Sequence, residues 1–134
     1  MKKFKNNIYK VVFAAALPVL LGTTMVFAGT SYLGYNTTVG KFNGNGYTGY
    51  QTKAISGANG NLHSSSVGGG YNVDVRMQKS NGTAGEWSRN VKSGSKRDLD
   101  GNVNHKKGDK IRLQFSNDFD TPVAVQVSGS WRSN

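Results

Sequence analysis

Apolar and polar residues alternate through three long stretches of this chain, and this alternation constrains the fold more than any other feature. Between Tyr71 and Lys79 the apolar residues fall at every second position, with polar residues between them. The same pattern runs through residues 110–116 and 123–132. Successive side chains of a β-strand point to opposite faces, so each stretch predicts a strand with one face buried.

The alternation also predicts which side chains build the core. The expected inward positions are Tyr71, Val73, Val75, Met77, Ile111, Leu113, Phe115, Val123, Val125, Val127 and Trp131. Trp87 shares a face with Arg89 and Val91 in a weaker stretch, and we expect it in the core as well. The positions between them are expected to face solvent, among them Asp74, Arg76, Gln78, Arg112 and Gln114.

Turn-forming pairs separate these stretches. Asn-Gly or Asp-Gly occurs within residues 43–46, 59–60, 81–82 and 100–101, and both pairs tolerate the positive φ angles of tight hairpins. Weaker strands are predicted at residues 32–39, 47–55, 62–67, 86–91 and 97–103. Seven or eight short strands at this spacing predict an all-β chain, folded as a single antiparallel β-sandwich or a small barrel.

Residues 1–28 have the composition of a secretory signal peptide. Four lysines and no acidic residue precede an apolar run at residues 11–21. Val26 and Ala28 are small side chains of the kind that signal peptidase accepts near its cut. We therefore predict a secreted, extracellular protein that is cleaved after Ala28.

A permanent membrane anchor is the alternative for this segment. A spanning helix needs about 20 apolar residues, whereas residues 11–28 include two Thr, a Gly and a Pro. The favoured prediction is a removed leader followed by one secreted domain at residues 29–134. The chain contains no Cys, which excludes a disulfide scaffold and fits export by a Gram-positive bacterium.

The last predicted strand carries a resemblance to known proteins. Ser116-Asn117-Asp118 is followed by Val125-Gln126-Val127-Ser128-Gly129-Ser130-Trp131, and Tyr50-Gln51-Thr52-Lys53 stands earlier. These segments resemble a family of small secreted β-rich proteins of Gram-positive bacteria, described only as a domain of unknown function. That family has an Arg in its early Tyr-Arg-Gln-Thr strand, which this chain lacks. The resemblance implies secretion and a β fold, and it implies no activity.

Catalysis is not expected from the titratable residues. The 7 acidic residues are dispersed, and Asp118 and Asp120 flank Phe119 in a predicted loop. His63 and His105 stand apart from each other, and the chain has no nucleophile-elbow pattern. We therefore predict a non-enzymatic protein without a cofactor.

Residues 98–109 partly match a calcium-binding loop. Oxygen-bearing side chains alternate from Asp98 to Asn104, and Asp109 is the twelfth residue. Val103, however, takes the sixth position, where that loop needs Gly, and lysines crowd the stretch. The favoured prediction is a hairpin with Asp100 at its tip and no metal ligands.

Positive charge is concentrated in one part of the chain. The sequence has 17 Lys+Arg and 7 Asp+Glu, a net charge of +10, and seven of the basic residues fall within residues 92–112. If the strands on either side of residues 100–101 pair, one hairpin gathers these charges, and an anionic cell-wall or membrane-surface component is the expected partner. A solvated hairpin without a partner is the alternative. The candidate polyanion-binding residues are Lys96, Arg97, Lys106, Lys107, Lys110 and Arg112.

Four tyrosines interleaved with Asn, Gly and Thr lie near the start of the predicted domain. Such rings stack on sugars or protein surfaces while neighbouring amides form hydrogen bonds. Closing the rim of the core is the alternative role. The candidate ligand-stacking residues are Tyr32, Tyr35, Tyr47 and Tyr50.

Together these features predict a secreted, non-enzymatic binding or effector protein acting at bacterial cell envelopes. Its size, basicity and lack of Cys make it bacteriocin-like by analogy. A carbohydrate-binding module that uses the tyrosines is one alternative. A calcium-supported structural protein of the extracellular or spore matrix is another. Nucleic acid is not an expected partner, because export is predicted and no binding motif is present.

Overall fold

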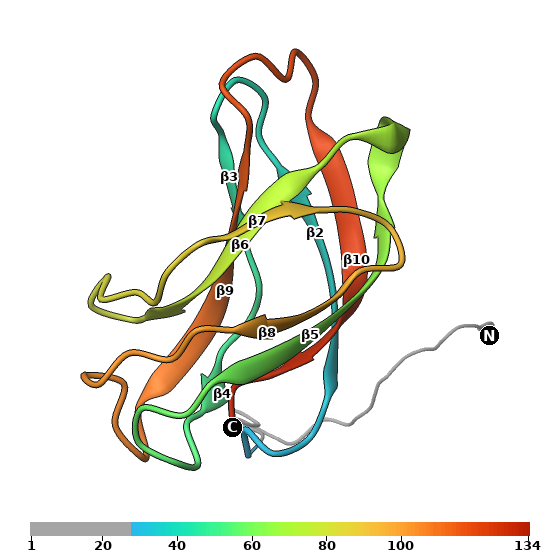
Figure 1. Ribbon diagram of the computed structural model, residues 1–134. Coiled ribbons are helices and arrows are strands. Elements are labelled where there is room, and N and C mark those ends of the chain that lie inside the picture. Colours follow the sequence, from blue (N-terminus) through green and yellow to red (C-terminus); the bar gives the residue numbers. More distant parts are fainter. Residues whose placement is uncertain (1–27) are drawn as a thin grey trace, which may run out of the picture.

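The computed structural model describes residues 28–134, which form two antiparallel β-sheets packed against each other (Figure 1). The predicted all-β sandwich is confirmed. The predicted leader lies outside the described residues except for Ala28, which forms a β-bridge with Thr52. No helix within residues 28–134 is long and apolar enough to cross a membrane.

One sheet has four strands, in the order β2-β10-β5-β8. Its strands are β2 Leu33–Val39, β10 Val125–Arg132, β5 Gly60–Val67 and β8 Lys96–Leu99. The last strand of the chain, β10, pairs with β2 on one side and with β5 on the other. The end of the chain is therefore enclosed between two early strands (Figure 1).

The other sheet has five strands. They are β3 Asn45–Tyr47, β4 Gln51–Thr52, β9 Lys110–Asn117, β6 Val73–Lys79 and β7 Ser88–Val91. Both β3 and β4 pair with one side of β9, β6 pairs with the other side, and β7 forms the far edge. A short 3-10 turn, η1 Gly68–Gly70, leads from β5 of the first sheet to β6 of the second.

The hydrophobic core lies between the two sheets. Val75, Leu113 and Trp131 are buried in it, as the alternation in their strands predicts. Each fully buried side chain of this size stabilises the fold by about 1.5–3 kcal/mol. The buried core residues are Tyr35, Val39, Leu62, Val67, Val73, Val75, Met77, Val91, Leu99, Ile111, Leu113, Phe115, Val125, Val127 and Trp131.

Strand boundaries differ from the expectation at several places: β7 begins at Ser88 and β8 ends at Leu99. Residues 47–55 form no single strand, because the chain there divides between β3 and β4. The described residues therefore hold nine strands, where eight stretches were expected. Val123 is 44% exposed and not inward-facing, because β10 begins only at Val125.

A buried lysine joins the two sheets at the end of the chain. Lys53 follows β4, and its Nζ donates hydrogen bonds to the carbonyl oxygens of Ala58 and Ser133, at 2.5 and 2.6 Å. The Gln51 side chain also bonds the backbone of Trp131 and Ser133. Burial lowers the pKa of Lys53 to about 8. These bonds fix the residues after β10 against the opposite sheet.

His105 is fully buried near Lys53. One ring nitrogen, Nε2, lies 2.8 Å from the carbonyl oxygen of Thr83, and Nδ1 has no hydrogen-bond partner among the described residues. Burial lowers the pKa of His105 below its ordinary value of 6.5; the Thr83 carbonyl opposes this shift, and the charges of Lys53 and Lys79 add to it. The folded protein therefore favours the neutral imidazole.

Acid is expected to destabilise the fold through His105. Between the lowered pKa and about 6.5 the unfolded chain binds more protons than the folded chain. The free energy of unfolding should therefore be highest above about pH 6.5 and decrease as the pH falls. Urea denaturation at about pH 7.5 and about pH 5 measures this change. A His105→Gln variant should lose most of it, and the matched His63→Gln variant should keep it. An undiminished change in His105→Gln would contradict the assignment.

Candidate functional site

The outer face of the five-stranded sheet carries polar side chains that other residues cover. Asp74, Gln78 and Gln114 point away from the core, yet they are only 7%, 8% and 7% exposed. The expectation that these three side chains lie on the outer face is confirmed, but the expectation that solvent covers them is wrong, because other residues bury them. In the register of β6 and β9, Gln114 lies opposite Arg76 and Gln78 lies opposite Arg112. The two central strands thus present a row of linked hydrogen-bonding groups.

A one-residue bulge between β6 and β7 turns Trp87 onto this outer face. The pairing shifts within the two strands, because β7 has one more residue than β6 between two successive pairs. Without that residue, the register would continue with Trp87 opposite Met77, facing the core. With it, Trp87 lies opposite Arg76 and outside the core. The prediction of Trp87 as a core residue is therefore wrong, and the side chain is only half-buried.

The bulge is held by a carboxylate and by one left-handed residue. Asn90 has a φ of 58°, a conformation that Asn adopts more readily than most residues. The Asp74 carboxylate accepts a hydrogen bond from the backbone N–H of Asn90 at 3.0 Å and another from the Arg89 guanidinium at 2.6 Å. Asp74 thereby fixes the edge of the sheet from which Trp87 projects.

A second bulge acts in the same way at the opposite edge. Between the β3 and β4 pairings the edge chain advances four residues, while β9 advances three. Tyr47 and Tyr50 are three residues apart and would face opposite sides of an unbroken strand. The extra residue brings both rings close to Arg112, whose guanidinium carbon lies 3.9 Å from the Tyr47 centroid and 5.4 Å from that of Tyr50.

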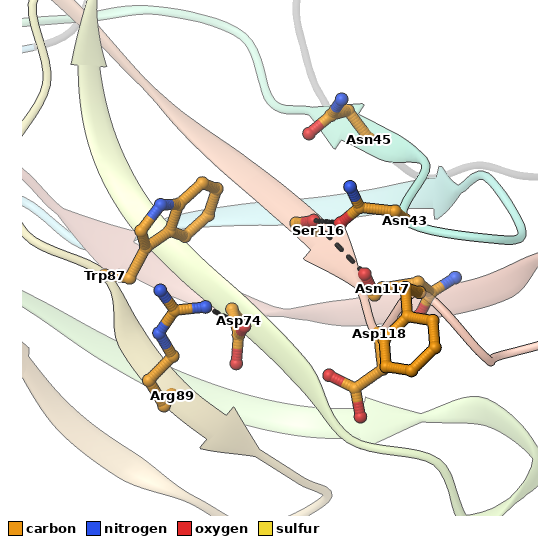
Figure 2. Close-up of a pocket in the computed structure, with 9 residues that line it drawn as sticks. Asn43, Asn45, Asp74, Trp87, Arg89, Ser116, Asn117 and Asp118 are labelled. Carbon is orange, nitrogen blue, oxygen red and sulfur yellow. Dashed lines mark hydrogen bonds and ion pairs between the residues drawn. The ribbon is translucent and has the colours of Figure 1, made fainter.

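A pocket of about 460 Å³, the end pocket, lies on this face. Figure 2 shows Trp87 and Arg89 on one side of it and Asn43, Asn45 and Ser116 on the other. Asp74 and residues 117–119 complete the lining. Its walls therefore come from both edges of the sheet and from the loop after β9.

The rim of the end pocket is held in a strained conformation. Phe42 and Asn43 both have positive φ angles, 52° and 61°. Their amides donate hydrogen bonds to the carbonyl oxygens of Thr121, at 2.8 Å, and of Asp118, at 3.0 Å. Left-handed conformations of residues other than Gly cost about 1–3 kcal/mol each and cluster at ligand sites. The two loops are thus tied together beside the pocket.

The end pocket combines aromatic and polar groups. The Trp87 ring and the Phe119 ring, which is 79% exposed, offer apolar surfaces. Asn43 and Asn45 offer amides, which both donate and accept hydrogen bonds, and Asp118 offers acceptor oxygens. This set matches a sugar ring, which has an apolar C–H face and hydroxyl groups that donate and accept.

The four predicted ligand-stacking tyrosines lie in different places. Tyr47 and Tyr50 share the outer face beside Arg112, whereas Tyr35 is buried, which raises its pKa to about 12. A side pocket of about 410 Å³ between β2 and the β3–β4 segment is lined by these three residues. Tyr32 does not line this pocket, and its ring stacks on His63 of the four-stranded sheet, with ring centroids 4.4 Å apart.

The basic hairpin expected around residues 100–101 is not formed. Strand β8, with Lys96 and Arg97, pairs with β5 in the four-stranded sheet. Strand β9, with Lys110 and Arg112, belongs to the other sheet, and the loop between β8 and β9 carries the remaining pair, Lys106 and Lys107. The six candidate polyanion-binding residues are therefore divided between two sheets and a loop.

The acidic residues of the calcium-like segment do not converge. Asp98 accepts a hydrogen bond from Asn61 at 3.0 Å, and Asp109 forms an ion pair with Lys79 at 2.9 Å. The hydrogen bond from Lys79 lowers the pKa of Asp109. Within residues 28–134, no group of three or more His, Asp or Glu side chains is placed to hold a metal ion.

Comparisons of the chain with protein-family models, with curated proteins and with solved structures find no match. The resemblance to small secreted proteins of Gram-positive bacteria accordingly stays a prediction. The candidate site rests on its own geometry, in which two bulges turn aromatic rings onto one face beside a polar pocket.

Proposed function

We propose that this protein is a carbohydrate-binding module that holds a sugar in the end pocket. One observation carries the proposal: the bulge at Asn90 turns Trp87 out of the core and into the wall of a pocket of about 460 Å³. Bulges often re-aim side chains next to ligand sites. A large aromatic ring outside the core does not contribute the stabilisation that a buried ring would. A role in contacting a ligand accounts for its position on the surface.

The chemistry of the lining supports a sugar over an apolar ligand. Polar groups dominate the pocket, and the aromatic rings of Trp87 and Phe119 stand among amides, a hydroxyl and carboxylates. An apolar ligand would leave these polar groups without partners, at a cost of about 1–3 kcal/mol for each buried group. A sugar satisfies both kinds of surface.

The predicted leader favours action outside the cell, and the positive charge that remains after its removal, 13 Lys+Arg against 7 Asp+Glu or +6 for residues 29–134, favours an anionic bacterial envelope. The proposal therefore keeps the sequence-based hypothesis of a non-enzymatic envelope-binding protein. It moves the contact surface from the basic hairpin to the end pocket. No feature of residues 28–134 favours a killing activity over binding alone.

A Trp87→Ala variant tests the proposal. Loss of one stacked ring from a sugar site should weaken binding by about tenfold, because an aromatic stack contributes about 0.5–1.5 kcal/mol beyond the area that it buries, and about 1.4 kcal/mol corresponds to tenfold in affinity. The loss of affinity is measured by comparing how purified wild type and variant bind to an oligosaccharide array and to insoluble cell-wall polysaccharide. The fold should survive, since the Trp87 ring lies outside the core.

Tyr32→Ala is the matched control for this experiment. Tyr32 is also a partly exposed aromatic residue beneath an arginine, with Arg132 at 4.7 Å, but it belongs to the opposite side of the sandwich. This variant should bind as the wild type does. Loss of binding in Tyr32→Ala with full binding in Trp87→Ala would place the site elsewhere and refute the proposal.

A further inference from the structure

We infer that the bound glycan is acidic, and that Arg76 and Arg112 bind carboxylate or phosphate groups along it. This inference rests on the proposed function, because it extends the same outer face beyond the end pocket. The two arginines, with Gln78 and Gln114 between them, are called the arginine ladder.

Two contacts hold the guanidinium of Arg76, one at Nε and one on its flat face. Its Nε donates a hydrogen bond to Gln114 Oε1 at 2.8 Å. Its guanidinium carbon lies 4.3 Å from the centroid of the Trp87 ring. A stacked and hydrogen-bonded guanidinium has lost most of its rotational freedom before any ligand arrives, so little further ordering is needed on binding.

Arg112 repeats this arrangement one strand away. Its Nε donates to Gln78 Oε1 at 3.0 Å, and its guanidinium lies 3.9 Å from the Tyr47 centroid. Tyr50 lies near the same guanidinium, at 5.4 Å. Both arginines thus combine an aromatic stack with an amide that fixes the Nε side.

The two glutamines form a continuous buried support. Gln78 Nε2 donates to Gln114 Oε1 at 3.3 Å, and Gln114 Nε2 donates to Asn45 Oδ1 at 3.0 Å. Asn45 also lines the end pocket, so the ladder and the pocket share a residue. A charge held in this network is oriented by groups that are themselves hydrogen-bonded.

The terminal nitrogens of both arginines remain available. A guanidinium has five N–H donors, and each arginine uses only Nε in hydrogen bonds to the described residues. Among residues 28–134 neither forms an ion pair, because the neighbouring Asp74 is paired with Arg89. The ladder therefore presents two oriented cations without counter-ions, an arrangement that suits planar carboxylates and phosphates.

The register spaces the two charges for one extended ligand. Arg76 lies opposite Gln114, and Arg112 lies two residues further along the same strand as Gln114. The backbone positions of such diagonal neighbours in an antiparallel pair are about 7–8 Å apart, and the two guanidinium groups extend from there toward opposite edges of the sheet, Arg76 over Trp87 and Arg112 over Tyr47. Two acidic groups of one polymer can thus be held together, which favours a polymer over a single ion by raising the effective concentration of the second contact.

Polygalacturonate, its fully methyl-esterified form and a poly(glycerol phosphate) teichoic acid are the probes. The esterified polymer keeps the sugar backbone and lacks the charge, while the other two separate carboxylate from phosphate. The double variant Arg76→Gln/Arg112→Gln removes the ladder charges. The matched control Lys106→Gln/Lys107→Gln removes two exposed charges of the loop between β8 and β9.

The wild type should bind at least one acidic polymer about tenfold or more tightly than the esterified polymer, and the ladder variant should lose that preference. The loop variant should keep it. The inference is overturned if the wild type shows no preference, if the ladder variant keeps it, or if the loop variant loses as much. A different result refutes the proposed function: the Trp87→Ala variant then binds both neutral and acidic glycans as tightly as the wild type does.

Discussion

Replacement of Val75 by aspartate is expected to abolish folding. Val75 is 0% exposed, lies in the middle of β6 and faces Phe115 across the pairing with β9. An unpaired carboxylate buried there costs several kcal/mol. The whole stability of a domain is only about 5–15 kcal/mol. Far-ultraviolet circular dichroism and thermal melting of the variant should show no cooperative transition.

Val103→Asp is the matched control for this substitution. Val103 is 76% exposed, in the loop between β8 and β9, so the same chemical change places the carboxylate in water. Surface changes of this kind alter stability by only about 0.5 kcal/mol. A cooperative, wild-type-like melt of Val75→Asp would contradict the assignment of this face to the core.

The strands that carry the core were predictable because their signal is local. In β6, β9 and β10 the pleat itself sets the alternation, so the burial of Val75, Leu113 and Trp131 follows from sequence order alone. The sandwich class follows from the same alternation together with the repeated turn pairs.

The candidate site depends on bulges, and alternation cannot reveal a bulge. The one extra residue at Asn90 reverses the face of the residues that precede it, and this reversal moves Trp87, which stands just before β7. What stabilises the bulge is a carboxylate 16 residues away, Asp74. A contact of that range is not encoded in the spacing of apolar residues. The run of hydrogen-bonding side chains at outward positions 74, 76, 78, 112 and 114 was the signal in the sequence that this outer face forms a network.

Strand pairing is the second reason for the errors. The strands around residues 100–101 are neighbours in sequence, and neighbouring antiparallel strands commonly form a hairpin. Here β8 and β9 enter different sheets, which separates Arg97 from Arg112. Arg97 instead donates hydrogen bonds to the carbonyl oxygens of Arg89 and Asn90, at 2.8 and 3.0 Å, and so braces the bulge. Arg112 joins the tyrosines that the sequence had suggested as a separate site.

Replacement of Asp74 by alanine is expected to lower both stability and sugar binding. The carboxylate accepts hydrogen bonds from the backbone N–H of Asn90 and from the Arg89 guanidinium, and it holds the bulge together with Arg97. Hydrogen bonds to charged groups contribute about 1.5–3 kcal/mol each, so we expect a loss of about 3 kcal/mol in the free energy of unfolding. Urea denaturation measures this loss directly.

The effect on binding separates a positioning role from a merely structural one. Without Asp74, the edge carrying Trp87 keeps only the Arg97 hydrogen bonds and is less firmly fixed, so sugar binding should weaken by about tenfold even at temperatures where the variant is fully folded. Asp74→Asn keeps an acceptor for the Asn90 amide and should retain more binding than Asp74→Ala. Asp98→Ala, which removes a carboxylate bonded to Asn61 on the opposite sheet, should change neither property by much. If Asp74→Ala lost stability but bound sugar as tightly as the wild type, Asp74 would not be what positions Trp87, and the Arg97 hydrogen bonds to Arg89 and Asn90 would hold the bulge without it.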